Sequence, residues 1–221
     1  MVEGPGLIAM AHAAGWEIEA VFVAAGEWSY QPPDGVAVYE LAPKVMEKVA
    51  STDTPQAALA AVRRRVAPLD ELAHADFVVI GDRIADPGNA GTMLRSAEAA
   101  GAAGVVFTSG SVDVFNPKVV RSSAGALFHV PLITDIALDV ALGAGRFRSW
   151  GTSSHRGVPY TEADFSGPTA IVVGNEAHGL SDEAPVDDWL TIPHAGRAES
   201  LNVAMATTVL VFDVVRQRGE R

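Results

Sequence analysis

The sequence has no cysteine among its 221 residues. This absence excludes disulfide bonds, thiolate-bound zinc and cysteine-ligated iron–sulfur clusters. It therefore also excludes radical chemistry on such a cluster and any mechanism that begins with a cysteine nucleophile. A chain without cysteine is compatible with a reducing compartment.

Long apolar runs are also lacking, because no run reaches the roughly 20 residues that cross a bilayer. The first twenty residues carry Glu3, Glu17 and Glu19 but no lysine or arginine. A secretory signal peptide begins with a basic segment, so this start does not resemble one. We therefore expect a soluble, cytoplasmic protein with no membrane partner.

Positive charge is scarce, with 16 Lys and Arg residues against 27 Asp and Glu residues and a net charge of −11. Taken alone, this balance argues against nucleic-acid binding, because phosphate contacts need Lys and Arg. Local charge decides the matter, and the one basic run is Arg63 to Arg65. The run is interpreted either as a solvated surface or as an RNA contact.

Hydrophobic residues make up 48% of the chain, which is typical of a folded protein with a sizeable core. The hydrophobic pattern predicts a small α/β domain within residues 1–68. Its expected elements are a helix over 5–15, a strand over 18–24, a loop over 26–35, a strand over 36–41, a helix over 43–49 and a strand over 57–62. An N-terminal strand or helix that could complete this domain is missing, so we expect that the native start lies upstream.

A second domain is predicted over residues 76–221, in which strands alternate with helices. The expected strands are 77–81, 104–108, 128–133, 148–153 and 169–173, and the expected helices are 90–100, 117–124, 136–142 and 201–218. This alternation predicts an α/β fold with a mainly parallel sheet and helices on both faces. The last helix is apolar on most sides, so we expect most of it to be buried.

Common nucleotide-binding signatures are absent from this second domain. Neither a P-loop nor a G-x-G-x-x-G fingerprint follows any predicted strand, which excludes a Rossmann-type dehydrogenase. Chemistry-bearing residues instead gather in three loops, each at the end of a predicted strand, where parallel sheets bind ligands. These loops cover residues 82–91, 174–179 and 192–202.

Each loop allows a functional and an ordinary structural interpretation. Arg95 follows the first loop close to a positive helix end, which suits a phosphate, but spacing alone favours a capped turn and a solvated arginine. The glycines of the second loop let a backbone approach a ligand, or simply form a turn. In the third loop Ser200 is well placed as a helix N-cap, and Asn202 is exposed, paired or functional.

The three loops together resemble the three motifs of the SpoU (TrmH) family in the SPOUT superfamily of RNA methyltransferases. The matching segments are Asn89-x-Gly91-x-x-x-Arg95, Gly174-Asn175-Glu176-x-x-Gly179 and Ile192-Pro193-x-x-Gly196-x-x-x-Ser200-Leu201-Asn202-Val203. The resemblance covers about residues 76–221, and residues 1–66 are similar to the L30e-like domain that binds substrate in this family. His194 departs from the pattern, because the family often has methionine there.

The resemblance implies S-adenosylmethionine as cofactor, an RNA ribose 2′-hydroxyl as acceptor and no metal. It also implies a deep trefoil knot in the C-terminal part of the sheet and a homodimer whose active sites lie across the interface. Arg95 is expected at the step in which the hydroxyl loses its proton. A guanidinium keeps its own proton up to a pH above about 12, so positioning the phosphate and ribose is its larger expected contribution.

The remaining site residues are also implied by the resemblance. Asn89 and Asn202 would hold Arg95 and the ribose, Ser200 would orient the hydroxyl, and Glu176 would support its loop or the arginine. The cofactor would be bound at Gly174, Ile192, Pro193, Gly196 and Leu201.

Two alternatives stay open at this point. One is a tRNA ribose methyltransferase. The tRNA members of this type usually lack the L30e-like domain and carry basic extensions, unlike this chain. This difference favours ribosomal RNA as the substrate, and 23S RNA in particular. The other is a non-catalytic RNA-binding or ribosome-assembly protein, against which the complete motif set argues.

Overall fold

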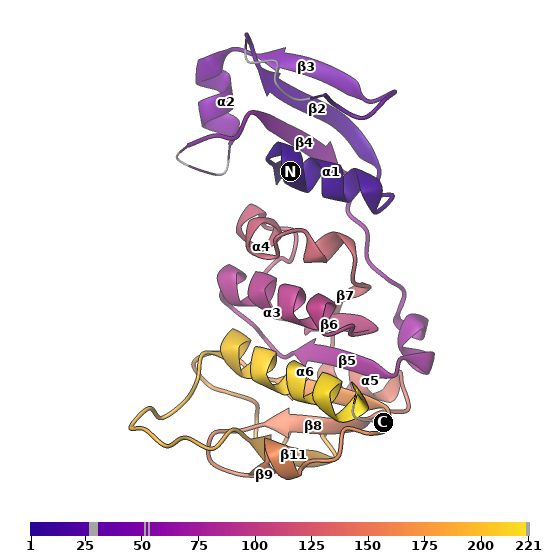
Figure 1. Ribbon diagram of the computed structural model, residues 1–221, viewed down its shortest axis with the longest axis vertical. Coiled ribbons are helices and arrows are strands. Elements are labelled where there is room, and N and C mark those ends of the chain that lie inside the picture. The colour runs from indigo at the N-terminus through magenta and orange to yellow at the C-terminus, as the bar shows by residue number, and fades with distance from the viewer. Residues whose placement is uncertain (27–30, 51, 53, 220–221) are drawn as a thin grey trace.

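The computed structural model describes residues 1–26, 31–50, 52 and 54–219, which form two separate β-sheets arranged along the long axis (Figure 1). Part of the loop predicted over 26–35 lies outside the described residues. Within the described part of the chain, no helix combines the length and apolar character needed to cross a membrane.

The N-terminal sheet has four strands in the order β1-β4-β2-β3. Its elements are β1 (Val2–Glu3), α1 (Pro5–Ala13), β2 (Ile18–Ala24), β3 (Ala37–Leu41), α2 (Pro43–Val49) and β4 (Ala58–Val62). Strands β2 and β3 are parallel, whereas β4 runs antiparallel to both β1 and β2. The predicted helices and strands are present within about two residues, and β1 is an additional strand that the pattern did not indicate.

The C-terminal sheet has seven strands, all paired in parallel, in the order β7-β6-β5-β10-β8-β11-β9. The strands are β5 (Phe77–Gly81), β6 (Gly104–Thr108), β7 (Leu132–Ile136), β8 (Arg148–Thr152), β9 (Val158–Pro159), β10 (Thr169–Val173) and β11 (Asp188–Thr191). Every residue of β5, β6 and β10 is buried, as expected for strands that are covered on both faces. The predicted parallel sheet is confirmed.

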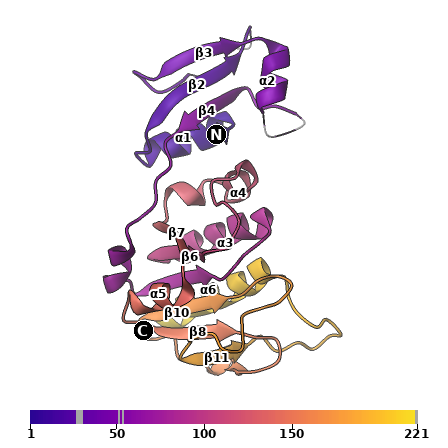
Figure 2. The ribbon, with the colours of Figure 1, turned by 180° about the vertical axis from the view of Figure 1, so that it is seen from behind.

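Helices cover both faces of this sheet. On one face, α3 (Pro87–Ala99), α4 (Pro117–Ser122) and α6 (Val203–Gly219) share a core with alternate strand residues such as Val79 and Ile171. On the other face, α5 (Leu138–Gly143) and the 3-10 helix η1 (Leu69–His74) pack on Val78 and Ile80 (Figure 2).

One predicted element is displaced in the structure. The strand expected over 128–133 is wrong in its position, because residues 126–128 form a 3-10 helix and β7 runs from Leu132 to Ile136, whereas the helix expected over 136–142 is present as α5, shifted by about two residues. Gly125, with φ of 94°, starts that helical turn, and Trp16 Nε1 holds the Phe128 carbonyl at 3.0 Å. Neither constraint is visible in the local apolar pattern.

The two domains are packed firmly against each other through Trp16. Its ring lies edge-on to Phe128 with a centroid distance of 5.2 Å, and α1 shares one continuous core with Val119 and Leu127. Arg64 adds an ion pair with Asp113 at 3.3 Å. The N-terminal domain is therefore held beside α4, next to the helix that carries the first motif (Figure 1).

Candidate active site

A cavity of about 860 Å³ opens at the carboxyl ends of the adjacent strands β8, β10 and β11. Its walls come from the segments 152–155, 174–182 and 192–203, together with the first turns of α6. This is the end of a parallel sheet at which ligands bind. The second and third predicted loops thus reach one site, and the first loop contributes Asp86 and Asn89.

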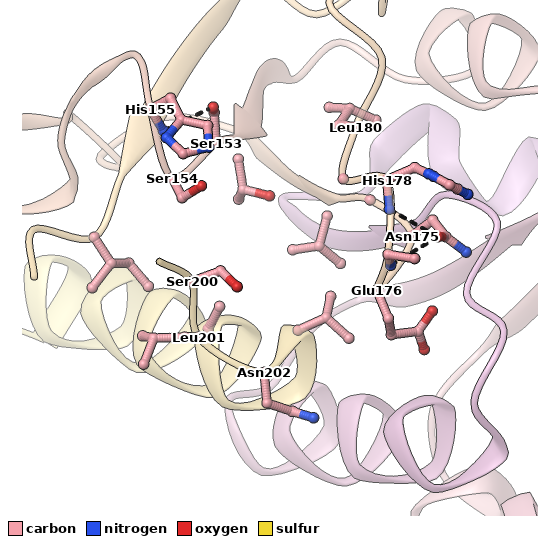
Figure 3. Close-up of a pocket in the computed structure, with 18 of the residues that line it drawn as sticks. Ser153, Ser154, His155, Asn175, Glu176, His178, Leu180, Ser200, Leu201 and Asn202 are labelled. Atoms are coloured by element: carbon pink, nitrogen blue, oxygen red, sulfur yellow. Dashed lines mark hydrogen bonds between the residues drawn. The ribbon is translucent and has the colours of Figure 1, made fainter. Parts of the chain in front are cut away.

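The cavity has an apolar floor and a polar rim. Val173, Leu190 and Leu210 are buried beneath it. Figure 3 shows Ser153 to His155 on one side, with Glu176 and Asn202 on the opposite side. A ligand with a flat apolar part and several polar groups matches this division.

Glu176 fastens the second loop to the first. Its two carboxylate oxygens accept hydrogen bonds from the backbone N–H groups of Ala85 and Asp86, at 3.0 and 2.9 Å, and from Asn89 Nδ2 at 3.0 Å. Asn175 adds a bond from Nδ2 to the carbonyl oxygen of Arg83 at 2.8 Å. The loop before α3 is therefore held in place by the loop after β10.

Asn202 joins the third loop to the same network. Its Nδ2 donates to Asn89 Oδ1 at 2.9 Å, and its Oδ1 accepts from the N–H groups of Ala204 and Met205. Asn202 is thus the N-cap of α6, and the expectation that Ser200 serves as this cap is wrong. Ser200 is exposed and lines the cavity, with its hydroxyl available to a ligand.

The pKa of Glu176 reflects two opposing effects. Partial burial raises it, but the hydrogen bonds from Asn89, Ala85 and Asp86 favour the charged form and together lower the pKa below its ordinary value. The carboxylate is therefore ionised at neutral pH. It places a negative charge at the rim of the cavity.

Gly174 is required by the packing of the second loop on itself. A Cβ atom here would collide with the backbone of Gly179 and Leu180. The sequence interpretation allowed either close approach by a ligand or a turn at this glycine, and the structure shows close packing within the turn. Gly174 also lines the cavity, so its small size serves the shape of the site.

The predicted cofactor residues divide into two groups. Gly174, Ile192 and Leu201 line the cavity, whereas Pro193 and Gly196 are exposed and do not. Arg95 is also exposed on α3, outside the cavity lining, and its side chain has no ion pair or hydrogen bond within the described residues. In this single chain, Arg95 is therefore near the motif network without entering the cavity.

Sequence reasoning missed the segment after β8. Ser153, Ser154 and His155 line the cavity, and so does His194. The first three follow a predicted strand, so the rule that ligands bind beyond strand ends would have included them. His194 belongs to the third loop, which the sequence had already singled out.

The Arg63–Arg65 run is largely engaged within the protein. Arg63 pairs with Glu17 and Glu19, and Arg64 pairs with Asp113 and stacks on the Phe115 ring at 5.2 Å. Arg65 is exposed without an ion pair in the described chain. Most of the run thus serves the N-terminal domain and its interface.

No cluster of three or more His, Cys, Asp or Glu side chains that could hold a metal ion occurs among the described residues. The chemistry available at the cavity comes from amides, hydroxyls, carboxylates and imidazoles.

Comparison with known proteins agrees with this geometry. Residues 76–212 match the SpoU rRNA Methylase family, and residues 1–60 match the MRM3-like substrate binding domain. The chain belongs to the SpoU rRNA methylase family. An N-terminal domain of the substrate-binding kind is thus present before the SpoU domain.

SpoU relatives match most of the chain. The 23S rRNA (guanosine(2553)-2′-O)-methyltransferase RlmP of Bacillus subtilis is 39% identical over 183 residues, which cover 80% of this chain and 72% of that protein. The crystal structure of the SpoU methyltransferase AviRb from Streptomyces viridochromogenes with AdoMet is 30% identical with a TM-score of 0.88, covering 98% of this chain and 89% of that one. The AdoMet-bound rRNA methyltransferase from Sinorhizobium meliloti is 30% identical with a TM-score of 0.86, covering 97% and 85%.

Proposed function

We propose that this chain transfers a methyl group from S-adenosylmethionine to a ribose 2′-hydroxyl of 23S ribosomal RNA. The observation that carries the proposal is the hydrogen-bonded chain from Asn202 through Asn89 to Glu176, which draws all three motifs to one cavity. The names of the matched relatives support the reaction and the RNA class.

The cavity fits the cofactor in size and in chemistry. Its volume of about 860 Å³ falls within the roughly 300–1,000 Å³ of small-molecule sites. The apolar floor suits a flat adenine ring, and the rim suits a ribose and an amino acid. Gly174, Ile192 and Leu201 would hold it, with Glu176 close to its positive charge. When bound, S-adenosylmethionine supplies a methyl group attached to a cationic sulfur.

The protein's own residues then have to position and deprotonate the acceptor. A ribose hydroxyl is a weak nucleophile at neutral pH and must lose its proton as it attacks. Ser200 has an available hydroxyl at the cavity and would orient the ribose. Arg95, which has no partner in the described chain, would bind the RNA phosphate beside that ribose.

The proposal includes a homodimer in which each site is completed by its partner. Helix α6 leaves an apolar face exposed, with Met205 at 64% and Phe212 at 47%. Arg95 lies on the neighbouring helix, which is joined to α6 by a hydrogen bond of 2.7 Å between Ser96 and Thr208. A second copy on this face would bury the apolar side chains and bring Arg95 towards a cavity.

We also infer the trefoil knot that the family resemblance implies. In support, the chain leaves β11 on the far side of β8 and returns across β10 to pack α6 on α3. The loop after β10 lies along this return path, since it lines the same cavity as the segment before α6.

The function is tested with Arg95→Ala, assayed by transfer of labelled methyl groups to unmodified 23S ribosomal RNA. We expect a rate at least about 100-fold lower, with S-adenosylhomocysteine binding and thermal unfolding unchanged. Arg146→Ala is the matched control, because Arg146 is an exposed arginine outside the cavity lining. Activity close to that of the unchanged protein in Arg95→Ala would contradict the assignment.

The substrate is tested by mapping 2′-O-methyl groups on ribosomal RNA from cells with and without the gene. Loss of one position in 23S RNA is expected. Loss of a 2′-O-methyl group from tRNA instead would identify the protein as a tRNA methyltransferase. Failure of the purified protein to bind S-adenosylhomocysteine would favour the non-catalytic RNA-binding alternative.

A further inference from the structure

Arg83, the second residue after β5, has an unusual backbone conformation. Its φ of 53° lies in the left-handed region, which residues other than glycine rarely adopt. Two tertiary hydrogen bonds hold it there. Its N–H group donates to Thr108 Oγ1 at 3.0 Å, and its carbonyl oxygen accepts from Asn175 Nδ2 at 2.8 Å. Backbone strain of this kind persists only where surrounding contacts fix it, and it is frequent at ligand contacts.

The side chain of Arg83 is anchored at one end and available at the other. Its Nε donates to Asp82 Oδ2 at 3.1 Å, and the Asp82 carboxylate is nearly buried and accepts from the Thr108 hydroxyl. The two terminal amino groups make no hydrogen bond within the described residues, although the side chain is 50% exposed. The guanidinium is therefore an oriented cation with two donor groups left for a ligand.

Arg83 lies between the loop that contacts the N-terminal domain and a loop that lines the cavity. Strand β5 has β6 on one side and β10 on the other. In the loop after β6, the Val112 N–H group donates to the Ile84 carbonyl at 2.8 Å. Asp113 in the same loop pairs with Arg64 of the N-terminal domain at 3.3 Å. An RNA strand that contacts both the N-terminal domain and the cavity therefore passes beside Arg83.

Such a strand needs positive charge at this point. Among the described residues, the cavity lining includes four acidic side chains but no lysine or arginine, so it repels phosphate groups. We propose that the terminal amino groups of Arg83 bind a backbone phosphate of the RNA substrate; this inference rests on the proposed function. This phosphate is separate from the one assigned to Arg95, which lies on α3.

Two substitutions of Arg83 test the proposal, with binding of unmodified 23S ribosomal RNA to the full chain as the measurement. Arg83→Gly and Arg83→Ala both remove the guanidinium, but only glycine adopts the left-handed conformation without strain. The glycine variant should therefore be the more stable of the two in urea unfolding. Both variants should bind RNA more weakly by a similar factor of about 10, as expected for the loss of a hydrogen bond to a charged group.

The dependence of RNA binding on salt distinguishes a phosphate contact from other causes of weaker binding. The slope of log affinity against log salt concentration should become shallower by about 0.7–0.9 in both variants. Binding of S-adenosylhomocysteine should not change, because Arg83 does not line the cavity. Arg146→Ala is the matched control, since Arg146 is an exposed arginine just before β8, at the opposite edge of the sheet. Its RNA affinity and slope should be normal.

Three results would overturn the proposal. Normal RNA affinity or an unchanged slope in both variants would show that Arg83 makes no phosphate contact. Weaker binding in Arg83→Ala that is restored in Arg83→Gly would assign Arg83 to the shape of its loop and to the ion pair with Asp82. If the unchanged protein binds no ribosomal RNA, the proposed function fails together with the inference, whereas the first two results leave the proposed function intact.

Discussion

The side-chain amide of Asn202 donates a hydrogen bond to Oδ1 of Asn89 at 2.9 Å, across 113 residues of chain. Asn89 in turn donates a hydrogen bond from its Nδ2 to Glu176 at 3.0 Å. The start of α6, the start of α3 and the loop after β10 are therefore linked by a single directional series of donors and acceptors. Removing any member loosens segments that are far apart in the sequence.

Asn202 has two separable tasks, which two substitutions distinguish. Asn202→Ala removes both the cap of α6 and the donor to Asn89, so we expect the free energy of unfolding to fall by about 1 kcal/mol. Asn202→Asp keeps an oxygen for the cap but loses the donor, so its stability should stay within about 0.5 kcal/mol of the original.

Both Asn202 variants should lose most of their methyl transfer, because both break the bond to Asn89. Urea unfolding measures the first effect and a methylation assay the second. Full activity of Asn202→Asp would show that the bond between the two asparagines is not needed for function.

Glu176 should make stability depend on pH. Folding lowers its pKa below the ordinary value of 4.5, so the ionised carboxylate stabilises the native state above that pH. The contribution is lost as the pH falls through the folded pKa. Glu176→Gln should therefore reduce the free energy of unfolding by about 1 kcal/mol at pH 7, and by less at pH 4 and below.

Glu183→Gln is the matched control for this measurement, because Glu183 is exposed on the segment after the same loop. Its side chain has no ion pair or hydrogen bond in the described part of the chain. Urea unfolding at several pH values compares the two variants. An equal pH dependence in Glu176→Gln and in the unchanged protein would contradict the role of these hydrogen bonds.

The sequence predicted the location of the site because parallel sheets place the carboxyl ends of their strands at one edge. Strands β5 and β10 are short, apolar and followed by polar loops, so local pattern alone located the first two motifs. Strand β11 carries Asp188 and spans four residues, and β9 spans two, so neither gave a usable pattern. The third loop stood out by its own residues, and the family resemblance identified it as a motif.

The local sequence pattern could not predict the roles of residues whose partners lie far away in the chain. Residue type alone makes both Ser200 and Asn202 suitable N-caps. In the structure Asn202 caps α6, and the same side chain also bonds to Asn89. Gly174 is needed because of Leu180, and the Phe128 carbonyl is held by Trp16 from the other domain. These are tertiary contacts, which periodicity does not encode.

Arg218 should be a main stabilising contact of the C-terminal helix. Its guanidinium donates to Phe165 O at 3.1 Å, Gly167 O at 2.8 Å, and both Asp76 O and Asp76 Oδ2 at 3.0 Å. These residues lie just before β10 and β5. We expect Arg218→Ala to reduce the free energy of unfolding by about 2 kcal/mol, because three backbone carbonyl groups and the Asp76 carboxylate lose the donor they share.

A lysine at the same position cannot reproduce a planar fork of donors, so Arg218→Lys should recover less than half of the loss. Arg146→Ala, at an exposed site, should stay within about 0.5 kcal/mol of the unchanged protein. Guanidinium unfolding of the three variants provides the comparison. Equal stability of Arg218→Ala and Arg146→Ala would show that the guanidinium contributes nothing.

The exposed face of α6 offers the sharpest test of the proposed dimer. Met205, Val209 and Phe212 repeat at helical spacing on the side opposite the buried Leu210 and are exposed by 37–64%. A carboxylate at the centre of such a face would have to be buried without a partner in a dimer. Phe212→Glu should therefore yield a monomer in sedimentation velocity, with unchanged circular dichroism.

Loss of the dimer should also abolish methyl transfer, since Arg95 does not line the cavity of its own chain. Val140→Glu is the matched control, because Val140 is an equally exposed apolar residue, at 47%, on α5 at the opposite face of the sheet. That variant should remain dimeric and active. When the two variants Phe212→Glu and Arg95→Ala are mixed, the mixture should stay inactive. If Phe212→Glu is an active monomer, one chain holds a complete site.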